Sequence, residues 1–195
     1  MNNIQRFLES VGLQLQEDGK LTNVCETENL RVIEDYIVLC EKGKTYYIYE
    51  VHRAERIMKK QDQDKERAVI WAVILYKRMN DNTADRIMTR KIRSMITDGD
   101  EASVKELFRE FNEDIFSIGK ETEDKLCLIE EHGQASVVYN GTAIVTAVSL
   151  SRAYIVLYNY CRKMQEILSF YRDQCVLMNE KEITQQEAVR LYMGI

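Results

Sequence analysis

The sequence predicts an α+β protein in which antiparallel sheets pack on helices, and two observations support that class. Residues 36–52 and 126–140 alternate aromatic or β-branched side chains with polar ones around a short turn, which is typical of β-hairpins. A strongly apolar segment of helical length comes after each of them, over residues 64–80 and 152–178. The sequence therefore favours two similar halves, each an antiparallel sheet against a helix.

The composition is that of an ordinary globular protein of 195 residues, 45% hydrophobic and 30% charged. The formal net charge of -5 argues against broad attraction to nucleic acid or anionic membranes, and mildly favours a basic partner. The five cysteines are scattered without a C-x-x-C pair, which indicates a reducing compartment. The first ten residues lack signal-peptide features, and the longest apolar run, residues 68–76, is far shorter than the roughly 18 residues of a membrane span. We therefore expect a cytoplasmic protein without a membrane segment.

The elements expected before residue 53 are a helix over 2–11, a hairpin over 13–25, a strand over 30–33 and a hairpin over 36–52. Apolar residues at three- and four-residue spacing indicate the helix, and Gly12 ends it. The first hairpin has an Asp18-Gly19 turn, and the second has a Lys42-Gly43 turn. The second hairpin is the clearest in the chain.

Three helices are expected in the middle of the chain, over residues 64–80, 83–97 and 101–115. Residues 57–63 are polar and precede the first helix, which Asp62 or Asp64 can cap. That helix is apolar nearly all round, so we expect it to be buried. The segment 98–100 ends the second helix, which has a basic face, and caps the third, which is acidic. These two helices predict an antiparallel hairpin with salt-bridged edges.

The elements expected after residue 118 are a polar linker over 119–124, strands over 126–131, 134–140 and 142–148, a long helix over 152–178 and a short last helix. Ser151 is the predicted cap of the long helix, and Thr184 and Glu187 have capping-box spacing for the last one. The resulting division is an N-terminal half, residues 1–118, and a C-terminal half, residues 119–195, within one compact unit.

The two hairpins also resemble each other when the sequence is shifted by 90 residues. The matched pairs are Glu41 with Glu131, Gly43 with Gly133 and Tyr49 with Tyr139. Three identities in twelve positions leave both chance and a duplication open, and the repeated order of elements is the stronger sign.

No catalytic or metal-binding motif occurs, because H-E-x-x-H, paired C-x-x-C, phosphate-loop and nucleophile-elbow patterns are all missing. We therefore expect no metal, no cofactor and no enzymatic activity. The pair of His52 and Glu50 leaves an alternative open. The two residues lie two positions apart on a strand, hence on one face, and could act in general acid–base catalysis. The competing interpretation is the solvated face of a half-exposed strand.

Tyrosines and charges of the second hairpin form a candidate partner-binding surface, typical of protein recognition if the rings point outward. Its residues are Glu41, Tyr46, Tyr49, Glu50, His52 and Glu55. The competing interpretation is that most of the tyrosines fill the interface between sheet and helix. A second candidate is a basic stripe that could contact phosphates, formed by Arg86, Arg90 and Arg93. The net charge makes a nucleic-acid partner the less favoured of the two.

Residues 36–76 contain the aromatic strand YYIYEVHRAER, a polar gap with several Asp residues, and a Trp-containing apolar helix, VIWAVIL. In this order of features the segment resembles bacterial immunity proteins of polymorphic-toxin systems, most nearly the family numbered sixty-three. The chain departs from the pattern at Ile57, where a glycine is expected directly after Glu55-Arg56. The resemblance implies a cytoplasmic protein without catalysis that binds and neutralises a cognate toxin, and it carries over no binding residue.

Overall fold

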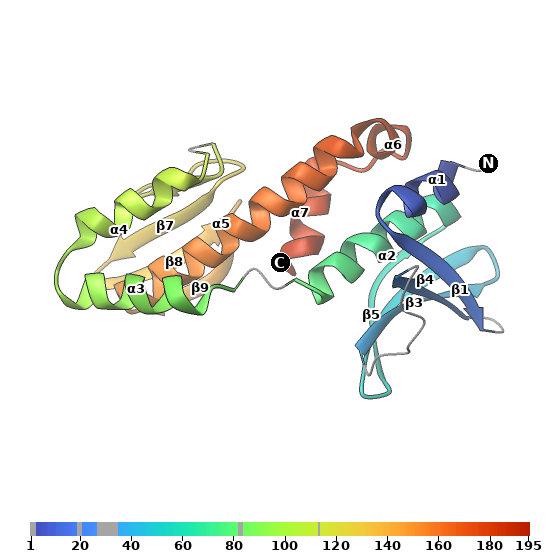
Figure 1. Ribbon diagram of the computed structural model, residues 1–195, viewed down its shortest axis with the longest axis horizontal. Helices are drawn as coiled ribbons and strands as arrows, with labels where there is room; N and C mark the ends of the chain where they lie inside the picture. The colour runs from blue at the N-terminus through green and yellow to red at the C-terminus, as the bar shows by residue number, and fades with distance from the viewer. Residues whose placement is uncertain (1–2, 19–20, 27–34, 82–83, 113) are drawn as a thin grey trace. The chain divides into compact units, whose positions relative to one another are not determined.

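The computed structural model describes residues 3–18, 21–26, 35–81, 84–112 and 114–195 (Figure 1). The chain forms two compact units. Unit 1 comprises Met1–Asp81 and Val176–Thr184, and unit 2 comprises Asn82–Cys175 and Gln185–Ile195. Each unit contains a β-sheet packed with helices, so the predicted α+β class is confirmed. The division after residue 81 differs from the expected one after residue 118, because the helix of residues 86–97 packs on the helix of residues 150–173, which in turn contacts the later sheet.

The sheet of unit 1 is an antiparallel meander of five strands in the order β1-β2-β3-β4-β5. Its elements are α1 (Asn3–Ser10), β1 (Leu13–Asp18), β2 (Leu21–Glu26), β3 (Asp35–Lys42), β4 (Thr45–His52), β5 (Glu55–Asp62), α2 (Lys65–Met79) and most of α6 (Cys175–Glu180). Gly12 ends α1 with a positive φ of 69°, as expected. Gly19 of the predicted first turn and the predicted strand 30–33 lie outside the described residues.

Strand β5 is an element that the sequence does not predict. Residues 57–63 were expected to be a polar connection, yet β5 pairs with β4 along its length and forms an edge of the sheet. A two-residue turn joins the strands, with Arg53 at a φ of 46° and Ala54 at a φ of 70°. Edge strands often carry charged side chains, which discourage pairing with a further strand, and this explains why no hydrophobic alternation marks β5.

Helix α2 forms the centre of unit 1, as predicted. The nine consecutive residues from Ala68 to Tyr76 are all buried, and the helix contacts strands β2, β3, β4 and β5. Asp64 is its N-cap and accepts hydrogen bonds from the backbone N–H groups of Glu66 and Arg67. Lys181, which follows α6, forms ion pairs with Asp64 at 3.2 Å and with Glu66 at 2.6 Å.

The sheet of unit 2 has four strands in the order β6-β7-β8-β9, with β6 parallel to β7 and the other pairs antiparallel. Its elements are α3 (Arg86–Thr97), α4 (Glu101–Leu107), η1 (Phe108–Glu110), β6 (Phe116–Ile118), β7 (Leu126–Glu131), β8 (Gln134–Tyr139), β9 (Thr142–Val148), α5 (Leu150–Asp173) and α7 (Gln185–Met193). The predicted meander of β7, β8 and β9 is confirmed to within one residue at each end. The parallel strand β6 was not predicted.

Three helix predictions in unit 2 were wrong in detail. The expected helix 101–115 ends at Leu107, and the 3-10 turn η1 follows. Ser149, not Ser151, caps α5, because its side chain accepts the N–H of Arg152. Helix α5 also ends at Asp173 rather than continuing to residue 178.

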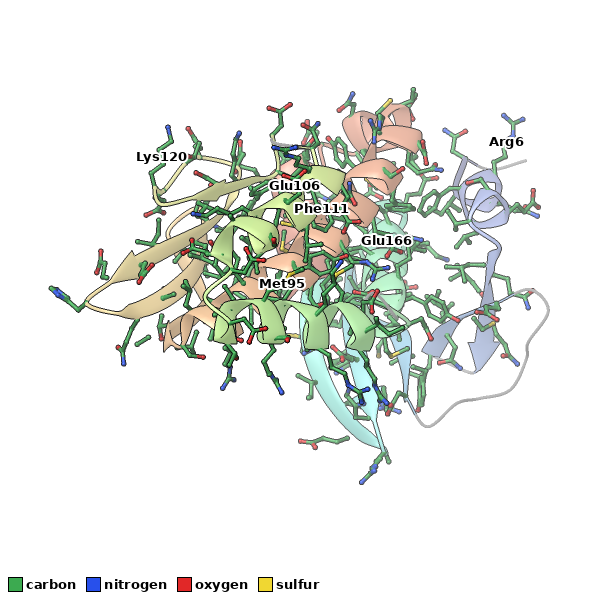
Figure 2. The ribbon with its side chains drawn as sticks, turned by 60° about the vertical axis from the view of Figure 1, so that its left-hand side comes forward. Arg6, Met95, Glu106, Phe111, Lys120 and Glu166 are labelled. Atoms are coloured by element: carbon green, nitrogen blue, oxygen red, sulfur yellow. The ribbon has the colours of Figure 1, made fainter. Side chains whose placement is uncertain are left out.

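Helices α3 and α4 pack together, but the expected salt bridges between them do not occur among the described residues. The ion pairs of this region lie within the segment formed by α4 and η1. Lys105 is 2.7 Å from Glu101, and Arg109 is 2.6 Å from Glu106. Figure 2 shows Glu106 on α4 and Met95 on α3. The acidic helix is held instead to α5, since the Tyr154 hydroxyl donates to Glu101 at 2.8 Å.

The repeated order of elements is present in both units. Strands β3, β4 and β5 are followed by α2, and strands β7, β8 and β9 are followed by α5. The residue match is less regular. The pairs that close the turns are Lys42 with Thr45 and Glu131 with Gln134, so equivalent turn positions are 89 residues apart and not 90. The glycine is therefore first in one turn and second in the other.

Candidate protein-binding surface

The two faces of the unit 1 sheet differ, and they divide the predicted surface. We call the face that packs on α2 the helix face and the opposite one the outer face. Lys60 of β5 lies on the helix face, because its Nζ is 3.6 Å from the ring centroid of Trp71 in α2. Because side chains alternate along a strand, Tyr46, Glu50 and His52 lie on the helix face and Tyr49 lies on the outer face.

The six predicted residues therefore do not form one patch. Glu41 and Tyr46 line a pocket near the β3–β4 turn. Glu50 and His52 lie at the opposite end of β4, and Glu55 pairs with His52 across the β4–β5 hairpin. The sequence already implied this division. Side chains alternate between the two faces of a strand, so Tyr46 and Tyr49, three residues apart, point to opposite faces.

His52 and three charged side chains, Asp35, Glu50 and Lys59, form a cluster on the helix face. Its Nε2 lies 2.9 Å from Oε1 of Glu50, and its Nδ1 lies 2.7 Å from Oδ1 of Asp35. Lys59 reaches the other oxygen of Glu50, with 3.1 Å between Nζ and Oε2. Since a carboxylate holds each ring nitrogen, the geometry favours the protonated imidazolium and leaves neither nitrogen free to accept a proton from a substrate.

These contacts shift the pKa values of His52 and Glu50. The hydrogen bond with Asp35, and then the one with Glu50, raises the pKa of His52 above its usual value. Burial by itself would raise the pKa of Glu50, but the hydrogen bonds from Lys59 and His52 outweigh it, so that the pKa is lowered. The contacts of the cluster therefore favour the charged form of both His52 and Glu50.

We expect the contribution of His52 to stability to depend on pH. A pKa that folding raises gives stability that is fully present below about 6.5, the value in an unfolded chain, and is lost as the pH rises through the higher folded value. Replacing His52 with Gln should therefore lower the urea midpoint more at pH 5.5 than at pH 8.5. In a His132→Gln background, the remaining imidazole NMR signal would report the titration directly. An equal midpoint difference at both pH values would contradict the expectation.

A strip of tyrosines and one methionine occupies the outer face, and we call it the tyrosine–methionine strip. Its members are Tyr36, Tyr47, Tyr49 and Met58. Tyr49 pairs with Met58 across the β4–β5 ladder, and its ring stacks on Tyr47 with 6.5 Å between centroids. Met58 is 53% exposed and the tyrosines are partly exposed. Within the described part of the chain, the three hydroxyls have no hydrogen-bond partner.

The predicted basic stripe lies on one helix, α3. Arg86, Arg90 and Arg93 are all exposed, and in the described residues none of them forms an ion pair. The helix itself contains no acidic residue. Asp85, which caps α3, is engaged by Arg162 of α5 at 3.4 Å. The stripe is therefore a local positive surface on an acidic protein.

Asp35, Lys59 and Met58 also belong to these surfaces and are not predicted from the sequence. The position of the β3–β4 turn decides which residue lies opposite His52. A turn at residues 43 and 44 places Asp35 there, whereas the predicted turn, one residue earlier, does not. Lys59 and Met58 were missed together with β5. Met58 lies beside Tyr49 because the two-residue turn at Arg53 and Ala54 sets that register, and the bulge shifts only the pairs from Ile48 with Lys60 onward.

Comparisons with known proteins add no relative. Neither a scan against protein-family models, nor a search of curated proteins, nor a search of solved structures finds a match. No helix in the described ranges has the length and apolar character needed to cross a membrane.

Proposed function

We propose that this chain is a non-catalytic binding protein of the immunity class, which neutralises a protein toxin by docking on the outer face of the unit 1 sheet. The tyrosine–methionine strip is the observation that carries the proposal. Tyrosine and methionine are enriched in the cores of protein interfaces, tyrosine because its large ring has few rotatable bonds and methionine because its flexible thioether adapts to an irregular surface. Tyr49 and Met58 lie side by side on adjacent strands, so a partner can cover both at once.

The resemblance to immunity proteins supports the class of partner. The segment that carries it, residues 36–76, forms β3, β4, β5 and most of α2, and so contains the whole strip. The His52 cluster supports a role without catalysis, because carboxylates engage both nitrogens of the ring. A general base needs one free nitrogen within reach of its substrate.

The test is binding to the toxic domain encoded by the neighbouring upstream gene. Co-expression and co-purification with that domain should give a complex, and titration calorimetry should give its affinity. If the upstream gene encodes no toxin-like protein and the chain captures none, the proposal fails.

The strip predicts which substitutions weaken that complex. Changing Tyr49 to Ser or Met58 to Ser should each reduce the affinity about tenfold or more, the usual effect at an interface hot spot. Val176→Ser is the matched control, since Val176 is an apolar side chain 70% exposed elsewhere on unit 1 and should leave the affinity unchanged. Equal losses in all three variants, or none, would place the interface elsewhere.

The basic stripe of α3 supports a second candidate, binding of a nucleic acid. Three exposed arginines without ion pairs within the described residues could contact phosphates. Fluorescence anisotropy with labelled DNA and RNA should then show affinity that falls with salt and is lost when Arg86, Arg90 and Arg93 are changed to Glu. Absence of binding at low salt would remove this candidate.

A further inference from the structure

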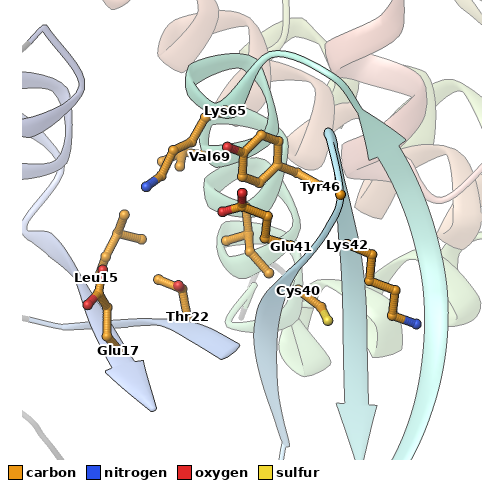
Figure 3. Close-up of a pocket in the computed structure, with 11 residues that line it drawn as sticks. Leu15, Glu17, Thr22, Cys40, Glu41, Lys42, Tyr46, Lys65 and Val69 are labelled. Carbon is orange, nitrogen blue, oxygen red and sulfur yellow. The ribbon is translucent and has the colours of Figure 1, made fainter. Parts of the chain in front are cut away.

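Unit 1 contains a pocket between the helix face of its sheet and the first turns of α2 (Figure 3). Its volume of about 620 Å³ lies in the range of small-ligand sites, roughly 300 to 1,000 Å³. Leu15, Leu39 and Val69 supply its apolar lining from β1, β3 and α2. Tyr46 adds an aromatic ring from β4. The pocket lies at the β3–β4 turn, whereas the His52 cluster lies where β4 ends, so the two sites are separate.

Two carboxylates line the pocket from different strands. Figure 3 shows Glu41 beside Tyr46 on one side, and Glu17 on the side of Leu15 and Thr22. Glu17 lies on β1 and Glu41 on β3, with β2 between them. Among the residues that the structure describes, neither carboxylate has an ion-pair or hydrogen-bond partner.

The positive charge of the pocket is smaller than its lining residues suggest. Lys42 is one of them, but its Nζ lies 5.5 Å from the ring centroid of Tyr47, a residue of the outer face. The ammonium of Lys42 is therefore directed away from the two carboxylates, as Figure 3 also shows. Lys65, the first residue of α2, is the remaining cation of the described lining, and it is exposed. Two carboxylates against one ammonium favour a cationic ligand.

We infer that this pocket binds a primary amine or guanidinium carried on a chain of methylene groups. The carboxylates of Glu17 and Glu41 would pair with the cationic head, and the face of Tyr46 would add a cation–π contact. The apolar lining would hold the methylene chain, as it holds the stems of long basic side chains. This inference goes beyond toxin binding and does not depend on it. The ligand could be a free polyamine or a lysine or arginine side chain of a peptide.

Titration calorimetry on the full-length chain, without any toxin, tests the inference with simple probes. Hexylamine has the cationic head and the methylene chain, and hexanoate has the same chain with an anionic head. Hexylamine should bind, and hexanoate should bind at least tenfold more weakly. Equal binding, or preference for hexanoate, would overturn the inference, because Lys65 or apolar contact alone would then govern the pocket.

Substitutions give predictions of opposite sign. Glu41→Gln and Glu17→Gln should each weaken hexylamine binding about three- to fivefold, the effect of an exposed charge pair. Lys65→Gln should strengthen it, because a repelling charge is removed. Glu131→Gln is the matched control, since Glu131 is an exposed glutamate at the end of the β7 hairpin strand in unit 2. An unchanged affinity in the Glu17 and Glu41 variants would overturn the inference.

Two further probes separate the possible sources of the amine. Tighter binding of spermidine than of a short lysine-containing peptide would identify a free polyamine as the ligand class, and the reverse would identify a basic side chain. Either order supports recognition of the amine, whereas failure of both probes together with hexylamine rejects it. Because no toxin is present, these results leave the toxin proposal to its own test.

Discussion

Replacing Trp71 with alanine is expected to lower the free energy of unfolding of unit 1 by about 3–5 kcal/mol, the usual cost of removing a large buried aromatic side chain. Trp71 is 2% exposed in the middle of α2, the helix that four strands contact. The substitution leaves a cavity that the surrounding side chains can fill only in part. It also removes the ring beneath the ammonium of Lys60. Such a loss is a large part of the stability of a typical domain.

Urea unfolding followed by far-UV circular dichroism measures this loss. Trp71 is the single tryptophan of the chain, so its fluorescence in the wild type identifies the transition that belongs to unit 1. Ile87→Ala serves as the control, because Ile87 is 80% exposed and should change the stability by less than about 0.5 kcal/mol. A midpoint for Trp71→Ala close to that of the control would contradict the buried position of α2.

The second large effect is expected at Asp62, the residue that ends β5. Its side chain is 5% exposed and receives two hydrogen bonds from Arg67, at 2.6 Å from Nε and 3.0 Å from Nη2. It also accepts the backbone N–H of Asp64, the N-cap of α2. Asp62→Ala removes all three bonds and should cost about 1.5–3 kcal/mol. The matched control is Glu106→Ala, whose ion pair with Arg109 is exposed on both sides and should contribute under about 1 kcal/mol.

The Asp62 contribution should also depend on pH. Burial alone would raise the pKa of Asp62, but the hydrogen bonds from Arg67 and Asp64 outweigh it and lower the pKa. A pKa that folding lowers gives stability that is present above about 3.9, the unfolded value, and is lost as the pH falls through the folded value. The difference between wild type and Asp62→Ala should thus be constant from pH 5 to 7 and shrink below pH 4. A difference that grows on acidification would contradict this mechanism.

Elements with a strong periodic pattern were predictable from the sequence. The strands around Gly43 and Gly133 alternate over several residues, and the nine buried residues from Ala68 to Tyr76 are uniformly apolar. In each case the side chains that mark the element also form its core. Asp64 and Asp100 were likewise predictable as caps, because a short side chain with an oxygen suits that position.

The elements that escaped prediction depend on partners distant in sequence. Strand β5 gains its regularity from pairing with β4 and carries polar side chains on an open edge. Strand β6 has three residues, and its parallel pairing with β7 leaves no local pattern. The His52 cluster was half predicted: the Glu50 contact follows from strand periodicity, whereas Asp35 depends on a register that a one-residue change in the turn alters.

The last contribution to unit 1 comes late in the chain. Residues 176–184 belong to this unit, and Lys181 forms ion pairs with Asp64 and Glu66 at the start of α2. A ribosome releases residues from the N-terminus onward, and domains usually fold in that order during synthesis. Here the first unit cannot be completed until the strands of the second unit and all its helices except α7 have been synthesised. A nascent chain stalled before residue 181 would therefore carry an unfinished first unit, in which protease sites around α2 stay accessible longer than its early position suggests.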